Sequence, residues 1–243
     1  MNNGPVAVVV SHPAHLLTVV GVLARRRPHV LILYRAGAGA GQEEAVCAAL
    51  DRHNVAASIT CFGVSEADSF EHALAGDFRL HAVLGARLSD WLHTVRPRAV
   101  LGDAYEAYNM PHDVARLLID RALRGTPGRV TNYEFPLSCR VDEPGAPVQY
   151  GVFPFGPFRS LRLSAEEAAV KFALVEEVGR HDPFVAVPAD RDYLAPPPGL
   201  ARYYDEHGRK CVAAGLHSRA ITFAEHFVPL VRALDRAPAT RTA

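Results

Sequence analysis

The chain has 243 residues, of which 49 % are hydrophobic, and its 26 basic and 26 acidic side chains give a formal net charge of zero. This length and hydrophobic fraction suffice for one large α/β domain with a sizeable core. The neutral balance argues against an electrostatic nucleic-acid binder. No apolar run reaches the roughly 20 residues of a membrane span, and the opening MNNGPVAVVV lacks the positive region of a signal peptide. We therefore expect a soluble cytoplasmic protein that binds neither nucleic acid nor membranes.

Strands and helices are predicted to alternate along the first 135 residues. The β-branched run Val6 to Val10 reads as a buried strand, and an apolar stretch of helical length follows it at residues 16–27. Further strands are predicted at residues 30–34, 57–62, 99–101 and 130–135, and further helices at residues 43–53, at residues 82–95 and from Pro111 onward. Between the helices predicted at residues 43–53 and 82–95, the sequence predicts a capping segment at residues 65–68 and then a loop that holds His72 and His81. Val83 is expected on the buried side of the helix at 82–95.

The last third of the chain differs in amino-acid composition from the rest. Residues 142–160 and 182–199 are rich in proline and glycine, which predicts long surface segments. A helix is predicted at residues 165–178, a turn at 203–208 and a closing helix at 220–234. We find no internal repeat and no boundary, so residues 1–243 are expected to form a single domain with a loop-rich C-terminal third.

Alternating strands and helices predict an α/β fold with a mainly parallel, Rossmann-like sheet that carries helices on both faces. The carboxyl ends of the first and fourth strands then open on the same crevice. His12 and His15 follow the first strand, and Asp103 and His112 follow the fourth. Imidazoles that converge in this way are suited to hold a divalent metal ion.

Three short motifs carry a family resemblance. They read SHPAHL at residues 11–16, NMPH at residues 109–112 and NYEFP at residues 132–136. Together with the segments at 167–178 and 223–227, they resemble the A-H-P-D-D-E, H-P-D-H and Y-Y-E-x-P motifs of the LmbE/PIG-L deacetylases. That family consists of zinc-dependent enzymes that hydrolyse N-acetyl groups on amino sugars. The resemblance implies a Rossmann-like single domain, a small-molecule substrate, a divalent metal cofactor and, because the family's members often oligomerise, a possible homo-oligomer.

The resemblance places the family's three metal ligands on His12, His15 and His112. His15 stands where the family has an aspartate ligand, so the ligand changes from a carboxylate to an imidazole. Three neutral imidazoles leave the charge of the metal uncompensated, but three-histidine zinc sites still activate water at neutral pH. Zinc is the expected metal, with iron or another transition metal as alternatives, because imidazole binds several of them.

At two other positions the resemblance implies catalytic residues that this sequence does not have. The family's general base falls on Ala14, and the histidine that polarises the substrate carbonyl falls on Asn109. Asn109 can steady an oxyanion but cannot transfer a proton. Asp103 and Glu106, after the fourth strand, are the nearest replacements for the base; Asp103 could equally hold the proton of a ligand histidine.

Tyr108 and Tyr133 are predicted to line the substrate pocket, although they could simply pack under the loop. Three hypotheses follow. The first is a divergent metal-dependent hydrolase of an N-acyl group on an amino sugar or specialised metabolite. The second is a non-hydrolytic metal enzyme of specialised metabolism on the same scaffold. The third is a non-catalytic binding protein.

Overall fold

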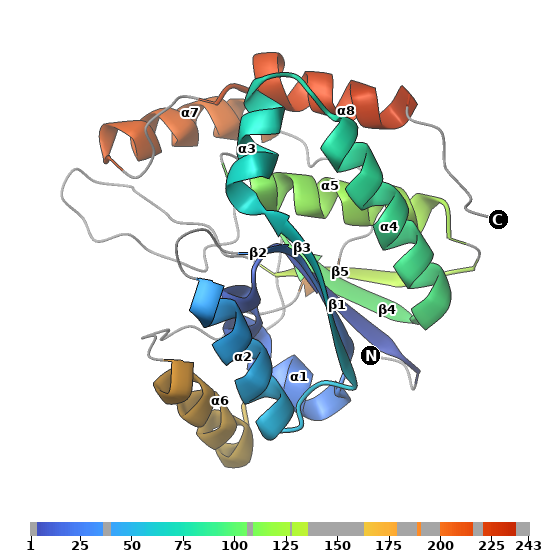
Figure 1. The fold of residues 1–243 in the computed structure, drawn as a ribbon, viewed down its shortest axis with the longest axis vertical. Coiled ribbons are helices and arrows are strands. Elements are labelled where there is room, and N and C mark those ends of the chain that lie inside the picture. The colour runs from blue at the N-terminus through green and yellow to red at the C-terminus, as the bar shows by residue number, and fades with distance from the viewer. Residues whose placement is uncertain are drawn as a thin grey trace.

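The protein is described by a computed structural model that covers residues 4–35, 40–105, 109–126, 128–135, 163–178, 189–190, 200–215 and 221–236. Its centre is a six-stranded sheet in the order β3-β2-β1-β4-β5-β6 (Figure 1). The strands are β1 (Val6–Val10), β2 (His29–Arg35), β3 (Ser58–Ser65), β4 (Ala99–Asp103), β5 (Thr131–Phe135) and β6 (Ala189–Asp190). The first five run parallel, and the two-residue β6 pairs antiparallel with β5 at the edge.

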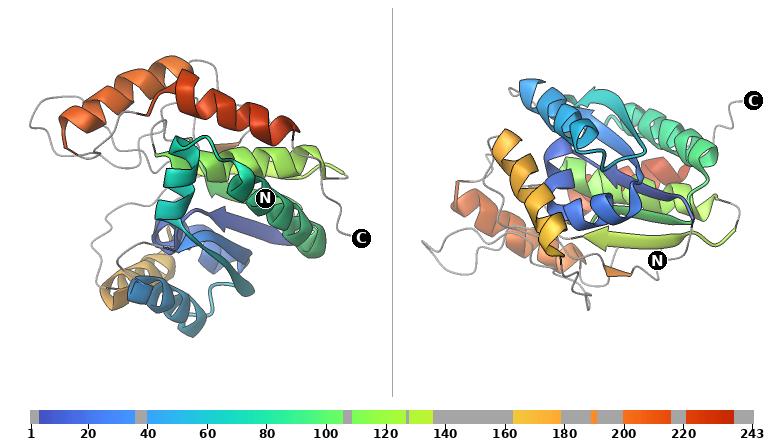
Figure 2. Two further views of the ribbon diagram at one scale, coloured as in Figure 1. Left: turned by 45° about the horizontal axis from the view of Figure 1, so that its top comes forward. Right: turned by 90° about the horizontal axis from the view of Figure 1, so that it is seen from below.

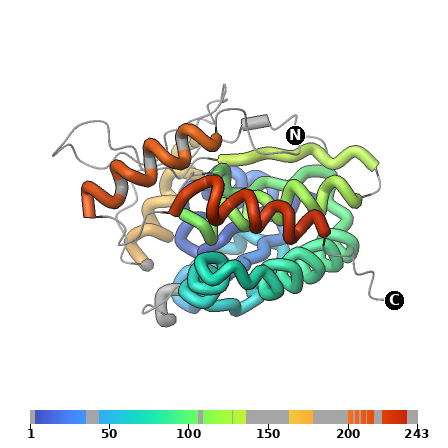
Figure 3. The backbone as a smooth tube through the Cα atoms, turned by 90° about the horizontal axis from the view of Figure 1, so that it is seen from above, coloured from blue at the N-terminus to red at the C-terminus, as the bar shows by residue number. Residues whose placement is uncertain are grey.

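Helices cover both faces of this sheet. The helical segments are η1 (Pro13–Val19), α1 (Val20–Arg26), α2 (Ala40–Arg52), α3 (Glu66–Leu74), α4 (Arg79–Val95), α5 (Met110–Arg124), α6 (Ala165–Val178), α7 (Leu200–Ala213), η2 (Phe223–Phe227) and α8 (Val228–Arg236). One face carries α1, α2 and α6, and the other carries α3, α4 and α5 with α7 and α8 outside them (Figures 1 and 2). Seen from above, α8 lies along α5 (Figure 3). None of the described helices is both long enough and apolar enough to cross a membrane.

The central strands are buried because both faces of the sheet are covered. Every residue of β1 is buried. Successive side chains point to opposite faces, so Ala7 and Val9 pack with α4 and α5, whereas Val8 and Val10 pack with α1 and α2. This two-sided burial explains why the strand reads as a continuous run of β-branched residues rather than an alternating pattern. The predicted α/β architecture is confirmed.

The segment after β1 begins differently from the prediction. Residues 13–19 form the 3₁₀ helix η1, and an α-helix starts only at Val20. Pro13 opens η1, and the Thr18 hydroxyl donates to the carbonyl oxygen of His15, three residues back, at 2.6 Å. The tight turn therefore places His12 and His15 at the carboxyl end of β1, ahead of the regular helix.

The region between β3 and α4 was predicted wrongly as a capping segment and a loop. Ser65 does cap a helix, since its hydroxyl accepts from the amide of Asp68. The helix is α3, however, and α4 begins at Arg79 rather than at residue 82. Val83 was also assigned wrongly to the buried face, because it is 56 % exposed.

The predicted turn at residues 203–208 is also wrong, because those residues lie inside α7. Its Tyr204 is fully buried and packs against the rings of Phe223 and Phe227. Tertiary packing therefore overrides the local turn signal. The closing helix is confirmed as α8, but it is preceded by a π-helical turn at η2. The predicted surface segment at residues 142–160 lies outside the described residues.

A buried polar network fixes α5 against β5. The fully buried Arg116 guanidinium donates to Asp120 Oδ1 and to Asn132 Oδ1, both at 2.8 Å, and to the carbonyl oxygen of Tyr133 at 3.2 Å. Asn132 Nδ2 donates in turn to Asp120 Oδ1 at 3.0 Å. A buried charge pair stabilises a protein only when further hydrogen bonds offset the cost of removing both charges from water, and here they involve both terminal nitrogens of Arg116. The network lies one helical turn beyond His112 and therefore sets the position of that histidine.

Replacing Asp120 by alanine leaves Arg116 buried without its counter-charge. We expect Asp120→Ala to lower the free energy of unfolding by about 3–5 kcal/mol, measured by urea denaturation. The control is Asp235→Ala. It removes a partly exposed ion pair between Asp235 of α8 and Arg121 of α5 and should lower the free energy of unfolding by less than about 1 kcal/mol. Equal losses of unfolding free energy in the two variants would contradict the role of Asp120 as the counter-charge of Arg116.

A second buried polar pair links α3 to α4. His81 and Ser69 are both fully buried, and His81 Nε2 lies 3.1 Å from Ser69 Oγ. Burial is the main cause that lowers the pKa of His81, to about 4, and the nearby His72 adds to it. The imidazole is therefore neutral in the folded protein at pH 7.

His81 makes folding stability depend on pH. Between pH 6.5 and 4 the unfolded chain binds a proton at this position and the folded chain does not, so stability falls as the pH falls. Relative to His81→Gln, the wild type should lose about 2 kcal/mol of unfolding free energy between pH 7.5 and 5. The exposed His93, on the same helix, supplies the control His93→Gln, which should follow the wild type. Parallel curves for the wild type and His81→Gln would refute this prediction.

Candidate metal centre

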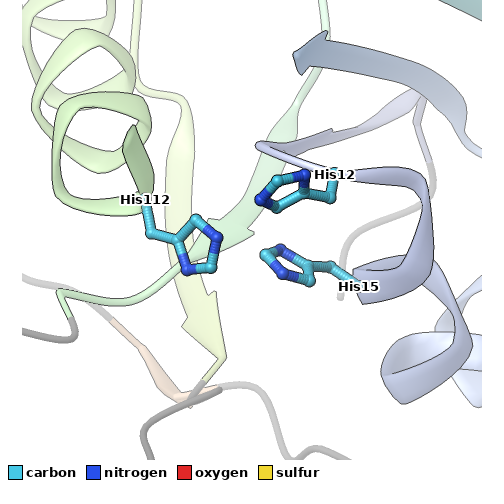
Figure 4. A group of neighbouring side chains, drawn as sticks. All are labelled: His12, His15 and His112. Carbon is cyan, nitrogen blue, oxygen red and sulfur yellow. The ribbon is translucent and has the colours of Figure 1, made fainter. Parts of the chain in front are cut away.

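Three imidazoles meet at the carboxyl edge of the sheet. β1 and β4 are parallel neighbours, so the turn after β1 and the start of α5 meet at one edge of the sheet. His12 and His15 lie on that turn, and His112 lies in the first turn of α5. Their rings point toward one another (Figure 4), with centroids 4.5–4.9 Å apart. One potential ligand nitrogen from each ring lies within 4.8 Å of the other two.

Asp103 fixes the ring of His15. Asp103 Oδ2 accepts hydrogen bonds from the Ser11 amide at 2.7 Å and from the Ser11 hydroxyl at 2.6 Å, and it lies 3.1 Å from His15 Nδ1. A carboxylate at this distance assigns the proton of His15 to Nδ1. Nε2 then carries the lone pair. This carboxylate–histidine arrangement is the one that orients metal-binding histidines in proteins.

Asp103 is an ionised carboxylate at a buried position. Burial alone would raise its pKa, but His15, His112 and the Ser11 hydroxyl outweigh burial and lower the pKa to about 2. Asp103 is fully buried. The carboxylate is therefore ionised at neutral pH and already bonded on Oδ2 to the strand end that precedes the histidines.

His12 has a carboxylate partner of its own. Its Nε2 lies 3.1 Å from Oε1 of Glu66, the first residue of α3. Burial lowers the pKa of His12 to about 4, and the two other histidines add to this effect against the opposing influence of Glu66. For Glu66, burial raises the pKa, but its hydrogen bond with His12 and the charges of the three imidazoles bring it below the usual value. At neutral pH the site thus contains a neutral His12 beside an ionised Glu66.

Asn109 lies directly beside the third histidine. It precedes α5, and its Nδ2 lies 3.2 Å from His112 Nε2. Pro111, in the first turn, suits the start of this helix because it has no amide hydrogen to leave unbonded. The amide of Asn109 is consequently placed at the edge of the histidine cluster, where it can donate to a bound group.

The other predicted site residues lie elsewhere. Glu106 and Tyr108 lie outside the described residues. Tyr133 is paired with Leu101 in the middle of β5 and packs against the core cluster beneath α1 and α6. A role for Tyr133 in binding substrate stays a prediction.

Sequence reasoning missed Glu66 and Ser11. Ser11 is the last polar residue before His12, and its position at a strand end was visible. Glu66 was interpreted as a residue that helps to cap a helix, and β3 was expected to end at residue 62, whereas it continues to Ser65. An end three residues later places Glu66 at the carboxyl edge, where parallel strands deliver site residues.

The donor set fits a divalent transition metal. Nitrogen ligands about 2.1 Å from one tetrahedral ion are about 3.4 Å apart. Nitrogens already within 4.8 Å of one another therefore need only a small inward movement of the rings. Neutral imidazoles are good ligands for zinc, iron, copper and nickel, and the Asp103 contact leaves His15 in a ligating tautomer. The cluster is compatible with a metal site.

Comparison by sequence finds no relative: no protein-family profile matches the chain, and no curated protein sequence matches it. Comparison by structure does find proteins with a similar fold. A deacetylase of the teicoplanin biosynthesis pathway, in its complex with bog, aligns with a TM-score of 0.53 at 15 % identity, covering 87 % of this chain and 94 % of the other. A deacetylase of the A40926 pseudoaglycone aligns with a TM-score of 0.51 at 14 % identity, covering 87 % and 93 %.

The zinc-inhibited form of a teicoplanin deacetylase also aligns, with a TM-score of 0.50 at 12 % identity, covering 86 % of this chain and 94 % of the other. At such low identities the likeness concerns the fold. The chain has a divergent LmbE/PIG-L-like fold, and the structures it resembles include deacetylases of specialised-metabolite biosynthesis.

Proposed function

We propose that the protein is a metal-dependent hydrolase that removes an N-acyl group from an amino sugar or a specialised metabolite. The observation that carries this proposal is the convergence of three imidazoles at the carboxyl edge of the sheet. The fold is shared with deacetylases that act in such pathways, which supports an acylated small molecule as the substrate class.

In this proposal His12, His15 and His112 hold a divalent cation. Zinc is the first choice, and the zinc-inhibited state of a deacetylase with the same fold supports a divalent metal. When bound, the cation acts as a Lewis acid that polarises the acyl carbonyl and activates water. The chain itself supplies the geometry: the three rings converge, and Asp103 holds His15 through its Nδ1.

Two further residues receive roles. Asp103 holds His15 rather than carrying a proton, because its Oδ2 is occupied by Ser11 and His15 and the residue is fully buried. Asn109 donates a hydrogen bond to the substrate's carbonyl oxygen as negative charge develops there. Glu106 remains our candidate for the proton carrier between water and the leaving amine.

A second function is favoured by one specific observation. Ala14 and Asn109 stand where the resemblance implies a base and a proton donor, so the metal-binding residues are retained and the hydrolytic partners are not. General base catalysis contributes about 10²–10⁴-fold. A non-hydrolytic metal enzyme on the same scaffold needs the three histidines and has no need of these partners.

The first test measures metal content and amine release on the same preparations. We expect about one divalent metal ion per wild-type chain and a chelator-sensitive release of amine from N-acetylated amino sugars. His12→Ala should lose both the metal and the activity, because two imidazoles are too few to hold the ion. His93→Ala, an exposed histidine on α4, serves as the control and should retain both.

The outcomes separate the functions. Bound metal without amine release from any acylated substrate would contradict the hydrolase and leave the non-hydrolytic metal enzyme. Wild-type protein that binds no metal, or His12→Ala with unchanged metal content, would overturn both and leave the non-catalytic binding protein.

A second prediction concerns Asp103. Replacing it by asparagine keeps the size but removes the charge that holds the Nδ1 proton of His15. Loss of such a partner typically costs about 10–100-fold in metal affinity, and we expect that loss for Asp103→Asn in a competition titration with a chelating dye. The exposed Asp90 on α4 provides the control Asp90→Asn. Unchanged affinity for Asp103→Asn would show that His15 needs no such support.

A further inference from the structure

Glu66 is the feature of the site that the family motifs do not account for. It comes from neither histidine segment: it is the first residue of α3, directly after β3, which is separated from β1 by β2 in the sheet. Its carboxylate nevertheless reaches the cluster, with Oε1 at 3.1 Å from His12 Nε2. Its side chain is 29 % exposed, so the carboxylate is not part of the buried core.

The distance between these two atoms is informative. Two ligands on one ion with bonds of about 2.1 Å are separated by about 3.0 Å in an octahedral site and about 3.4 Å in a tetrahedral one. The spacing between Glu66 Oε1 and His12 Nε2 lies in this range. Without an ion, the same spacing is that of a hydrogen bond from His12 Nε2–H to the carboxylate, so a bound ion would take the place of that proton. Asp103, by contrast, contacts His15 through Nδ1.

Charge gives the second argument. Three neutral imidazoles bring no negative charge to a divalent cation, and Asp103 is one hydrogen bond removed from the cluster. Desolvating an uncompensated cation is costly. Glu66 is the second carboxylate that contacts an imidazole of the cluster, and its side chain is partly exposed where Asp103 is fully buried.

We propose that Glu66 is the fourth protein ligand of the metal centre, so that the site is three histidines and one glutamate. The inference rests on the proposed metal function of the three histidines. It replaces the carboxylate ligand lost at His15 with one from a different element, and it leaves Asp103 as the outer support of His15. A ligand set of three nitrogens and one oxygen suits zinc, iron or manganese.

The test uses the full-length protein and metal alone. Affinity for Zn²⁺ is measured by competition with a chelating dye, and the visible absorption of bound Co²⁺ reports the ligand set. Glu66→Gln keeps a hydrogen-bond acceptor for His12 but removes the charged ligand oxygen. We expect it to lower Zn²⁺ affinity by about 1000-fold, beyond the 10–100-fold typical of an outer partner, and to alter the Co²⁺ spectrum. Glu71→Gln, exposed on the same helix, should change neither.

The outcomes are distinct for the two proposals. If the wild type binds Zn²⁺ and Glu66→Gln loses no more than about 100-fold with an unchanged Co²⁺ spectrum, Glu66 only orients His12 and the four-ligand site is wrong, while the metal function stands. If the wild type binds no metal, both proposals fall. Should Glu66→Gln fold poorly by circular dichroism, Glu66→Asp carries the same test, because its shorter side chain keeps the charge but withdraws the oxygen from the ion.

Discussion

The candidate site depends on one buried carboxylate, Asp103, at the end of β4. Burying an ionised carboxylate costs several kcal/mol unless hydrogen bonds compensate it. Here the compensating donors come from the turn after β1 and all bond to Oδ2: the amide and hydroxyl of Ser11, and the ring of His15. Oδ1 is buried without a hydrogen-bond partner among the described residues. Because the charge is stable only while these donors surround it, Asp103 ties the turn after β1 to the end of β4. The positions of His12 and His15 follow from that tie.

The third histidine is held by a separate mechanism. His112 sits on α5, which lies close over β4 because Gly102 has no side chain; a Cβ there would overlap the end of Ile119. The Arg116 network then locks the same helix to β5. Asp103 fixes the ring of His15 and the turn that carries His12, and helix packing positions His112. The cluster is thus preorganised by elements that are themselves buried, which a metal site requires for a defined geometry.

Most of the sheet could be predicted from the sequence, because strands buried on two sides leave continuous β-branched runs such as Val6 to Val10. The meeting of His12, His15 and His112 followed from the same reasoning, since parallel neighbours end at one edge. Glu66 could not be found in this way. Its place depends on β3 continuing three residues beyond its apolar run, and on α3 being stabilised by packing onto α5 rather than by a strong local pattern. The turn predicted at residues 203–208 is wrong for a related reason. Tyr204 packs against the rings of Phe223 and Phe227 in η2, which is distant in the sequence, and this packing stabilises α7 there.

The two carboxylates that contact the cluster bear on which chemistry the site performs. Asp103 is committed to His15, and a Glu66 that ligates the metal is committed as well, so neither is left to move a proton. The proposed hydrolysis then requires another proton carrier, for which Glu106 is our candidate, with the amide of Asn109 proposed for the oxyanion. A non-hydrolytic reaction requires only the metal and its ligands. The choice between the two functions therefore depends on a proton carrier and not on the metal centre, which both functions share.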